Sequence, residues 1–417
     1  MKTRKKNMFP DFGDLLFCLL GVFSSLPLSA QEAPILESRA GVLMDAATGT
    51  LLYVKNGDEE IPPASLTKLM TIHIALQEIA AGRAALEEIV PLSRESWAIN
   101  QPPRSSLMFL AAGQRVSLGE LLLGLAIPSG NDAAVAVALR FAPRVEEFVG
   151  LMNREAREMG LFQTRFVEPS GISEENITTA REFAYFCREY LRLHPESLKN
   201  LHSVREFAYP KVSNVGEAYR NRPGTILQSN HNTLLAEGFE GVDGLKTGYI
   251  DEAGYNIALT AERRGTRFIA VILGAPAAYR GDRIRDEDGR RLLTWGFDHF
   301  KTLRPELGEL PAARIWKGQG DYVPILPGES LVFTAPAERG ASLRWETEIV
   351  EPLTAPLPAG SPVGELILFD QRGELRRFSL ITGETMEAGG GLKQLWDSIQ
   401  LFFTSWGKKD KPRPPSG

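Results

Sequence analysis

The sequence predicts a mixed fold of the α/β (α+β) class, in which an antiparallel sheet is flanked by helices and a smaller β-rich domain follows. Two apolar runs around a turn at residues 41–54 predict a first hairpin. Helical periodicity then dominates from residue 65 to residue 193. Runs rich in β-branched residues return at 241–274, and beyond residue 303 prolines recur between short alternating runs.

The chain has 417 residues, of which 43% are hydrophobic and 24% charged, which is typical of a globular protein with two or three domains. Residues 1–30 are predicted to be a cleaved secretory signal. A basic start precedes an apolar run at 15–28, and Leu28-Ser29-Ala30 ends that run in small residues. A single uncleaved membrane anchor is the alternative, although the run is short for a membrane span. We therefore expect an exported protein.

Charge and cysteine content exclude several classes of function. Residues 1–30 carry four basic and two acidic residues, so their removal changes the net charge from −5 to −7. A mildly acidic exported protein is a poor nucleic-acid binder. Cleavage leaves Cys187 as the single cysteine, which rules out an internal disulfide. The five histidines have no ligand-like spacing, so we predict neither a metal site nor a cofactor.

The first chemical motif follows the first hairpin. Pro62 and Pro63 bias the chain toward extended backbone, and a helix is predicted to start at or beside Ser65 and to end near Gly82. Side chains three residues apart share a helix face, so the Ser65 hydroxyl and the Lys68 amine should point the same way. A neutral lysine could then activate the serine as a nucleophile. The alternative is that Ser65 only caps the helix and Lys68 is solvated.

A second motif lies between two buried helices. Residues 84–100 begin a polar region that we expect to be rich in helix, an apolar helix covers 118–127, and another starts near Asp132. The tight connection 128–131 between them would hold the Ser129 hydroxyl and the Asn131 amide rigidly toward a ligand. Alternatively, these side chains only cap the second helix. Two more helices are predicted at 145–159 and 181–193.

The third motif falls on a predicted edge strand at 241–248. There Lys246 supplies a positive charge, Thr247 a hydroxyl, and Gly248 room for the close approach of a substrate backbone. An ordinary surface turn is the alternative. Strands at 255–260 and 268–274 follow, and a helix at 290–300 is expected to close the main domain.

The remaining chain predicts a small β domain and a terminal helix. Short strands are expected at 330–334 and 365–369. After Gly389-Gly390-Gly391, the apolar residues of 392–406 cluster mainly on one side of a helix, and a basic tail follows. This pattern favours a helix that lies in an anionic membrane surface, and a helix docked on the β domain is the alternative. The predicted segments are 1–30, 31–302, 303–386 and 387–417.

The three motifs together resemble one family. Pro-Ala-Ser65-Leu-Thr-Lys68-Leu-Met-Thr, Ser129-Gly-Asn131-Asp-Ala and Asp-Gly-Leu-Lys246-Thr-Gly are similar to motifs of the low-molecular-mass penicillin-binding proteins, the D-alanyl-D-alanine carboxypeptidases of bacterial cell walls. The resemblance covers nearly the whole chain after the signal. It implies the transpeptidase and β-lactamase-like fold, with an all-helical insertion that carries Ser129 and Asn131.

The resemblance also implies roles for the nucleophile side of the site. Ser65 would attack the penultimate D-alanine carbonyl while Lys68 takes its proton, and the backbone N–H groups of Ser65 and Tyr249 would form the oxyanion hole. Asn131 would hold the peptide amide, and Ser129 would help to carry a proton to the leaving amine.

On the other side of the site, the resemblance assigns substrate binding to residues 246–249. Lys246 would share the proton transfer, Thr247 would bind the terminal carboxylate, and the Lys-Thr-Gly248 strand would receive the peptide. An arginine ahead of the closing helix assists in this family, and Arg285 fits this place better than Arg283 or Arg280.

The implied activity is removal of the terminal D-alanine from peptidoglycan stem peptides, with acylation by β-lactams. The segment between Asn131 and Lys246 lacks a Glu-x-x-Leu-Asn motif, so efficient β-lactam hydrolysis is not expected, and Lys68 is the first candidate to activate the deacylating water. An inactive wall-binding protein and an endopeptidase are the alternatives. The expected location is the periplasm or the outer face of the cytoplasmic membrane, with peripheral attachment.

Overall fold

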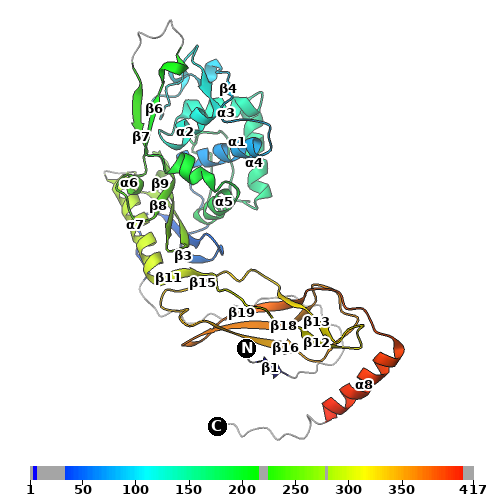
Figure 1. The fold of residues 1–417 in the computed structure, drawn as a ribbon. Helices are drawn as coiled ribbons and strands as arrows, with labels where there is room; N and C mark the ends of the chain where they lie inside the picture. The colour runs from blue at the N-terminus through cyan, green and yellow to red at the C-terminus, as the bar shows by residue number, and fades with distance from the viewer. Residues whose placement is uncertain (1–2, 7–32, 216–223, 278–279, 407–417) are drawn as a thin grey trace. The chain divides into compact units, whose positions relative to one another are not determined.

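The computed structural model describes residues 3–6, 33–215, 224–277 and 280–406. Contacts divide the chain into two units at Phe300, close to the predicted domain boundary at residue 303 (Figure 1). The first unit runs to His299. The second holds the described residues from Phe300 onward together with strand β1 (Thr3–Lys6). The remainder of the predicted signal segment lies outside the described residues.

A five-stranded antiparallel sheet forms the centre of the first unit, in the order β3-β2-β10-β9-β8. The predicted strands are confirmed, and the strand with Lys246 lies at the sheet edge as predicted. The bounds are β2 (Ala40–Asp45), β3 (Leu51–Lys55), β8 (Val242–Ile250), β9 (Gly254–Arg263) and β10 (Thr266–Ala275).

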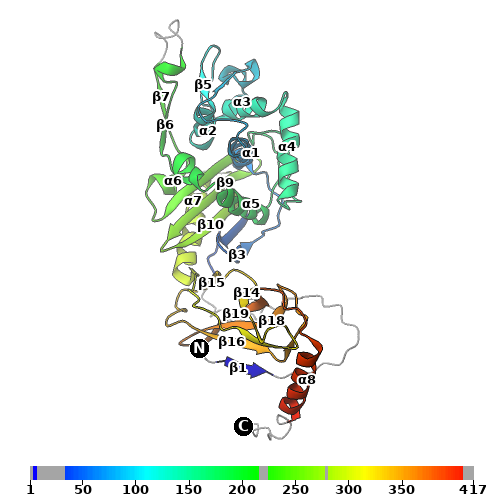
Figure 2. The same ribbon diagram turned by 45° about the vertical axis from the view of Figure 1, so that its right-hand side comes forward.

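Helices cover both faces of this sheet (Figure 2). Ile269 and Val271 point into one apolar core shared with the first five helices, while the alternate residue Phe268 meets the last helix of the unit. The helices on the first face are α1 (Lys68–Ala80), α2 (Leu118–Ala126), α3 (Asn131–Phe141), α4 (Val145–Glu158) and α5 (Ala180–Leu193). Four of the five start within one residue of the predicted position, whereas α1 starts three residues after Ser65 because a 3₁₀ turn precedes it.

The closing helix is longer than predicted. It is α7 (Gly281–His299), whereas the sequence pattern predicted a helix only at 290–300. Its first half is rich in Asp, Glu and Arg, and the buried residues of that half are glycine, arginine or aspartate, so no apolar periodicity marks the helix there. Arg285 therefore lies inside this helix and not ahead of it, which corrects the sequence interpretation.

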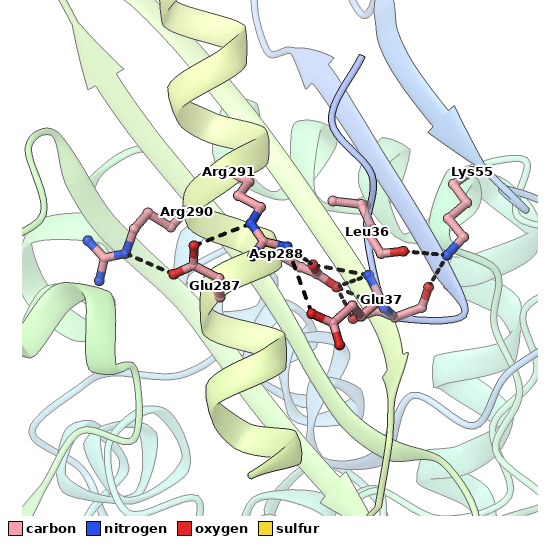
Figure 3. A network of polar contacts seen from close by, with 8 residues as sticks. Leu36, Glu37, Lys55, Glu287, Asp288, Arg290 and Arg291 are labelled. Atoms are coloured by element: carbon pink, nitrogen blue, oxygen red, sulfur yellow. Dashed lines mark hydrogen bonds and ion pairs between the residues drawn. The ribbon is translucent and has the colours of Figure 1, made fainter. Parts of the chain in front are cut away.

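Asp288 on α7 fastens residues 37–38 beside the sheet (Figure 3). Its buried carboxylate accepts the Ser38 N–H at 2.8 Å, the Ser38 hydroxyl at 2.6 Å and the Glu37 N–H at 3.0 Å. From β3, the Lys55 ammonium donates to the carbonyls of Leu36 and Ser38. This network fixes the segment that leads into β2.

The region after α1 is less helical than predicted. Residues 84–100 contain strand β4 (Ile89–Val90) and two single 3₁₀ turns, Arg94–Ser96 and Ala98–Asn100. Pro91 interrupts a helix here, and β4 pairs with β5 (Val116–Ser117) instead. Farther along, β6 (Glu206–Tyr209) and β7 (Ile226–Ser229) form a hairpin, and α6 (Thr233–Ala236) precedes β8.

The second unit is β-rich, with a five-stranded sheet in the order β1-β16-β18-β19-β14 and its own apolar core. The predicted strand at 365–369 lies inside β18, whereas the one predicted at 330–334 begins only at Phe333, because a bend at residues 328–329 follows β14. The strands are β11 (Phe300–Leu303), β12 (Ala313–Trp316), β13 (Tyr322–Val323), β14 (Ile325–Pro327), β15 (Phe333–Pro336), β16 (Arg344–Val350), β17 (Leu353–Thr354), β18 (Pro362–Asp370) and β19 (Gly373–Thr382).

The predicted terminal helix is α8 (Gly391–Trp406), at the end of the second unit where β12 and β13 lie (Figure 1). Its polar side docks on this unit. The Asp397 carboxylate accepts the Lys317 N–H at 2.6 Å, and Lys393 pairs with Asp321. Six large apolar side chains of α8 stay exposed, namely Leu392, Leu395, Trp396, Ile399, Phe402 and Phe403. Within the described residues, no helix is long and apolar enough to cross a membrane.

Candidate active site

The candidate nucleophile sits in a short turn before α1. Residues Ala64–Thr67 form a 3₁₀ helix that starts with Ala64 at φ +50°, a left-handed conformation unusual for alanine. The Ser65 hydroxyl accepts a hydrogen bond from the Lys68 ammonium at 2.9 Å. Ser65 caps neither the 3₁₀ helix nor α1, so the interpretation of this serine as a helix cap is wrong. Its hydroxyl is available for chemistry.

Lys68 is fully buried and held from three sides. Its Nζ donates to Ser65 Oγ, to Asn131 Oδ1 at 2.7 Å and to the Ser170 carbonyl at 2.5 Å. Burial lowers the Lys68 pKa to about 7, although the negative charges of Glu168 and Asp132 act in the opposite direction. A substantial fraction of this amine is therefore neutral at pH 7 and able to accept a proton. The interpretation of Lys68 as a solvated residue is wrong.

The loop between α2 and α3 brings Ser129 and Asn131 to the same place. Ser129 is 2% exposed, adopts φ +64°, and its buried Oγ has no hydrogen-bond partner. The N-cap of α3 is Gly130, and neither side chain caps the helix, which excludes the capping interpretation. Behind the loop, the buried Asp132 carboxylate accepts the N–H groups of Met108 and Leu110 and so fixes a second wall of the site.

Strand β8 runs directly beside the nucleophile. A Cβ atom on Gly248 would lie 2.9 Å from the Pro63 carbonyl oxygen and 3.0 Å from the Ser65 nitrogen. Only glycine allows this close approach, as the sequence motif suggested. Thr247 is buried, whereas Tyr249 is exposed and donates its hydroxyl to Asp251 at 2.6 Å.

Lys246 and Arg285 add positive charge at this strand. Lys246 is 2% exposed, and its Nζ donates to the Thr247 carbonyl at 3.0 Å. Burial lowers the Lys246 pKa well below its ordinary value, and the charges of Lys68 and Arg285 lower it further. Arg285 donates to Asp286 at 2.8 Å, which neutralises part of its charge. Hydrogen bonds and close packing thus join Ser65 and Lys68 to Asn131 and Gly248, and the charges of Lys246 and Arg285 act nearby. The Tyr249 side chain instead turns to Asp251.

His231 is a neighbour of the site that sequence reasoning did not select. Its pKa is lowered to about 4, first by loss of ring hydration and then by the charges of Lys246, Arg285 and Lys68, although the residue as a whole remains exposed. No spacing pattern links a lone histidine to a motif fifteen residues later. Across the described parts of the chain, no group of three or more His, Cys, Asp or Glu side chains is placed to hold a metal ion.

Comparison with protein families agrees with this geometry. Residues 28–277 match the model of the D-alanyl-D-alanine carboxypeptidase family, and residues 308–388 match the C-terminal domain of penicillin-binding protein 5. The D-alanyl-D-alanine carboxypeptidase DacC of Escherichia coli strain K12 is 35% identical over 381 residues, which cover 90% of both chains. DacA of the same strain is 30% identical over 379 residues, 89% of each chain.

Solved structures extend the similarity. Penicillin-binding protein 5 from Haemophilus influenzae matches with a TM-score of 0.74 and 28% identity, over 86% of this chain and 99% of that one. Penicillin-binding protein D2 from Listeria monocytogenes in its ampicillin-bound form matches with a TM-score of 0.53 and 27% identity. That match covers 64% of this chain and all of the Listeria chain.

Proposed function

This chain belongs to the D-alanyl-D-alanine carboxypeptidase family, and we propose that Ser65 is the nucleophile through which it works. The protein is a serine-type D-Ala-D-Ala carboxypeptidase that removes the terminal D-alanine from peptidoglycan pentapeptide stems and is acylated by penicillin. Its family acts on peptidoglycan peptides and binds β-lactams, which implies an exported location.

The observation that carries this assignment is the contact of Ser65 with a buried lysine whose pKa is about 7. In the proposed reaction, neutral Lys68 takes the Ser65 proton as Oγ bonds to the penultimate D-alanine carbonyl carbon. We assign stabilisation of the negative charge on the carbonyl oxygen to the backbone N–H groups of Ser65 and Tyr249, and the close packing of Gly248 on Pro63 and Ser65 supports this pairing.

Collapse of this intermediate breaks the peptide bond and forms the acyl-enzyme. The proton that Lys68 took from Ser65 then passes to the leaving amine, and we assign its relay to Ser129, whose buried hydroxyl has no other hydrogen-bond partner, and to Lys246. Lys68 is neutral again after this transfer. Asn131 binds the peptide amide. Thr247 and Arg285 bind the terminal carboxylate, and the positive charge of Lys246 assists them. Water then attacks the acyl-enzyme with Lys68 as the base, and the shortened stem peptide leaves.

Mass spectrometry of residues 31–417 mixed with penicillin tests the nucleophile. We expect a penicillin-sized adduct on the Ser65 peptide, no adduct in Ser65→Ala, and D-alanine release from diacyl-lysyl-D-alanyl-D-alanine by the wild type alone. An adduct without D-alanine release would favour an endopeptidase. Absence of any adduct would favour the inactive wall-binding protein.

We also infer that α8 attaches the protein peripherally to the outer face of the cytoplasmic membrane, on the periplasmic side. The support is its orientation: the polar side is occupied by contacts from Asp397 and Lys393, while six large apolar side chains remain exposed. Such a patch is uncommon on a soluble surface. Residues 407–417, which carry the basic tail, lie outside the described residues.

Sedimentation with anionic lipid vesicles tests the attachment. Phe402→Glu with Phe403→Glu, or removal of residues 391–417, should move the protein from the vesicle pellet to the supernatant. Tyr322→Glu is the matched control, because Tyr322 is an equally exposed aromatic residue outside the helix, and this variant should still sediment. If a precursor that keeps residues 1–30 but lacks residues 391–417 stayed at the membrane in cells, the attachment would belong instead to an uncleaved N-terminal segment.

A further inference from the structure

The loop at 168–176 contacts the turn and the helix that carry the proposed nucleophile and base. The Ser170 carbonyl accepts from Lys68 Nζ, and the Pro169 carbonyl accepts from the Thr71 hydroxyl at 2.7 Å, one turn farther along α1. Gly171, at φ +83°, packs so closely that a Cβ there would lie 1.9 Å from the Ala64 carbonyl oxygen. The position of this loop therefore sets both the Lys68 amine and the strained turn that presents Ser65.

One carboxylate organises this loop from inside. Glu168 accepts hydrogen bonds from the Ser170 N–H at 2.7 Å, the Ser170 hydroxyl at 2.6 Å and the Gly171 N–H at 2.5 Å. It also accepts from the Asn176 amide at 2.6 Å and from the Ser173 N–H at 3.4 Å. Charged acceptors make the stronger hydrogen bonds, so a single side chain supplies most of the polar interactions that shape the loop.

We propose that Glu168 is a positioning residue for the carboxypeptidase reaction, which acts by holding the Ser170 carbonyl against Lys68 and Gly171 against the Ser65 turn. This proposal rests on the function proposed above for Ser65 and Lys68. None of the three sequence motifs includes Glu168, which lies between the second and the third motif along the chain.

A role for Glu168 as the base that activates the deacylating water is the competing assignment. A carboxylate has about four lone-pair sites, and five donors already surround this one. A water molecule would have to displace one of the hydrogen bonds that shape the loop. The geometry therefore favours a structural anchor that acts through the loop and through its charge.

The charge of Glu168 has a separate, measurable effect. Four charged or titratable groups surround Lys68: Glu168 from the loop, Asp132 from α3, Lys246 from β8 and His231 ahead of α6. The two carboxylates stabilise the ammonium form and raise the Lys68 pKa against the effect of burial. Loss of the Glu168 charge should therefore lower that pKa, so that acylation remains active to lower pH.

The test is the second-order rate constant for acylation by penicillin, measured from pH 5 to pH 9 in the intact protein. For Glu168→Gln we expect the high-pH plateau to fall by about 10- to 100-fold, because the base and the nucleophile are misplaced, and the midpoint to move to lower pH. Glu168→Asp keeps the charge but shortens the side chain, so its plateau should fall while its midpoint stays near that of the wild type. A loss of stability alone would lower the final yield of adduct, whereas the molecules that remain folded would keep the wild-type plateau rate constant and midpoint.

Glu175→Gln is the matched control, since it removes the same charge from an exposed position of the same loop and should match the wild type in both quantities. A wild-type plateau in both Glu168 variants would overturn the proposal. Normal acylation of Glu168→Gln with accumulation of the acyl-enzyme would also overturn it, in favour of the base. If Glu168→Gln does not fold, the plateau rate constant of Glu168→Asp decides: a lowered value supports the proposal and a wild-type value overturns it. Failure of the wild type to form an adduct at Ser65 would instead refute the proposed function.

Discussion

The two buried lysines of the site lie in opposite kinds of surroundings. Lys68 on α1 is surrounded by three protein acceptors, whereas Lys246 on β8 donates to the carbonyl of its own neighbour Thr247. Two carboxylates partly compensate the charge of Lys68, while the strongest charges acting on Lys246 are the positive ones of Lys68 and Arg285. On the α1 side of the site, each of the three N–H donors of the Lys68 ammonium therefore has an acceptor within the protein.

The difference indicates a division of labour. A pre-arranged amine with a pKa of about 7 suits proton transfer at neutral pH, since a general base works best near the operating pH. A buried lysine that lacks a compensating anion suits the binding of one, and the substrate of a carboxypeptidase ends in a carboxylate. The protein thus supplies the partners of Lys68 and leaves those of Lys246 to the ligand.

Replacement of Lys68 should give the largest effect. In Lys68→Arg the guanidinium keeps a positive charge but cannot act as a base, so acylation by penicillin should slow by about 10²- to 10⁴-fold. The rate of adduct formation, followed by mass spectrometry, measures it. A loss of less than tenfold would mean that another group takes the Ser65 proton. The assignment of proton transfer to Lys68 rather than Lys246 would then be wrong.

The sequence predicted the helices, the loop and the strand that form the site and the motif residues on them, but not the residues that reach the site from other segments. Ser65, Ser129 and Lys246 were found because each belongs to a short motif on a predictable helix, loop or strand. Glu168 and His231 were not, because their importance depends on the approach of a loop and a turn that are far from the motifs along the chain. The start of α7 was missed for a related reason, since its charged first half makes contacts that only the folded chain provides.

The pH dependence of acylation should distinguish the lysines next. Catalysis needs neutral Lys68, so the rate should fall as pH drops through about 7, by roughly tenfold for each unit below the midpoint. The measurement is the acylation rate with a β-lactam whose own charge is constant over this range. A profile that stays flat down to pH 5 would assign the base to a group of much lower pKa.

Replacement of Lys246 should have a smaller effect that depends on the substrate. In Lys246→Gln we expect kcat/KM for a peptide that ends in a free carboxylate to fall by about 10- to 100-fold, as expected for loss of one buried charged partner. The corresponding peptide amide should lose much less, because it has no negative charge for Lys246 to bind. Equal losses for both substrates would mean that Lys246 acts chiefly in proton transfer.

A change remote from both lysines should have the smallest effect on the site. Asp288→Asn puts an amide opposite the N–H groups of Glu37 and Ser38, so unfolding should become easier by about 1–3 kcal/mol. Thermal denaturation of the variant, measured in the same buffer as the wild type, should show a lower Tm. Because Asp288 lies on the sheet face opposite α1, the pH midpoint of acylation should not move. If it did move, the state of Lys68 would depend on the packing of the whole sheet, and the local account of its pKa given by burial, Glu168 and Asp132 would be insufficient.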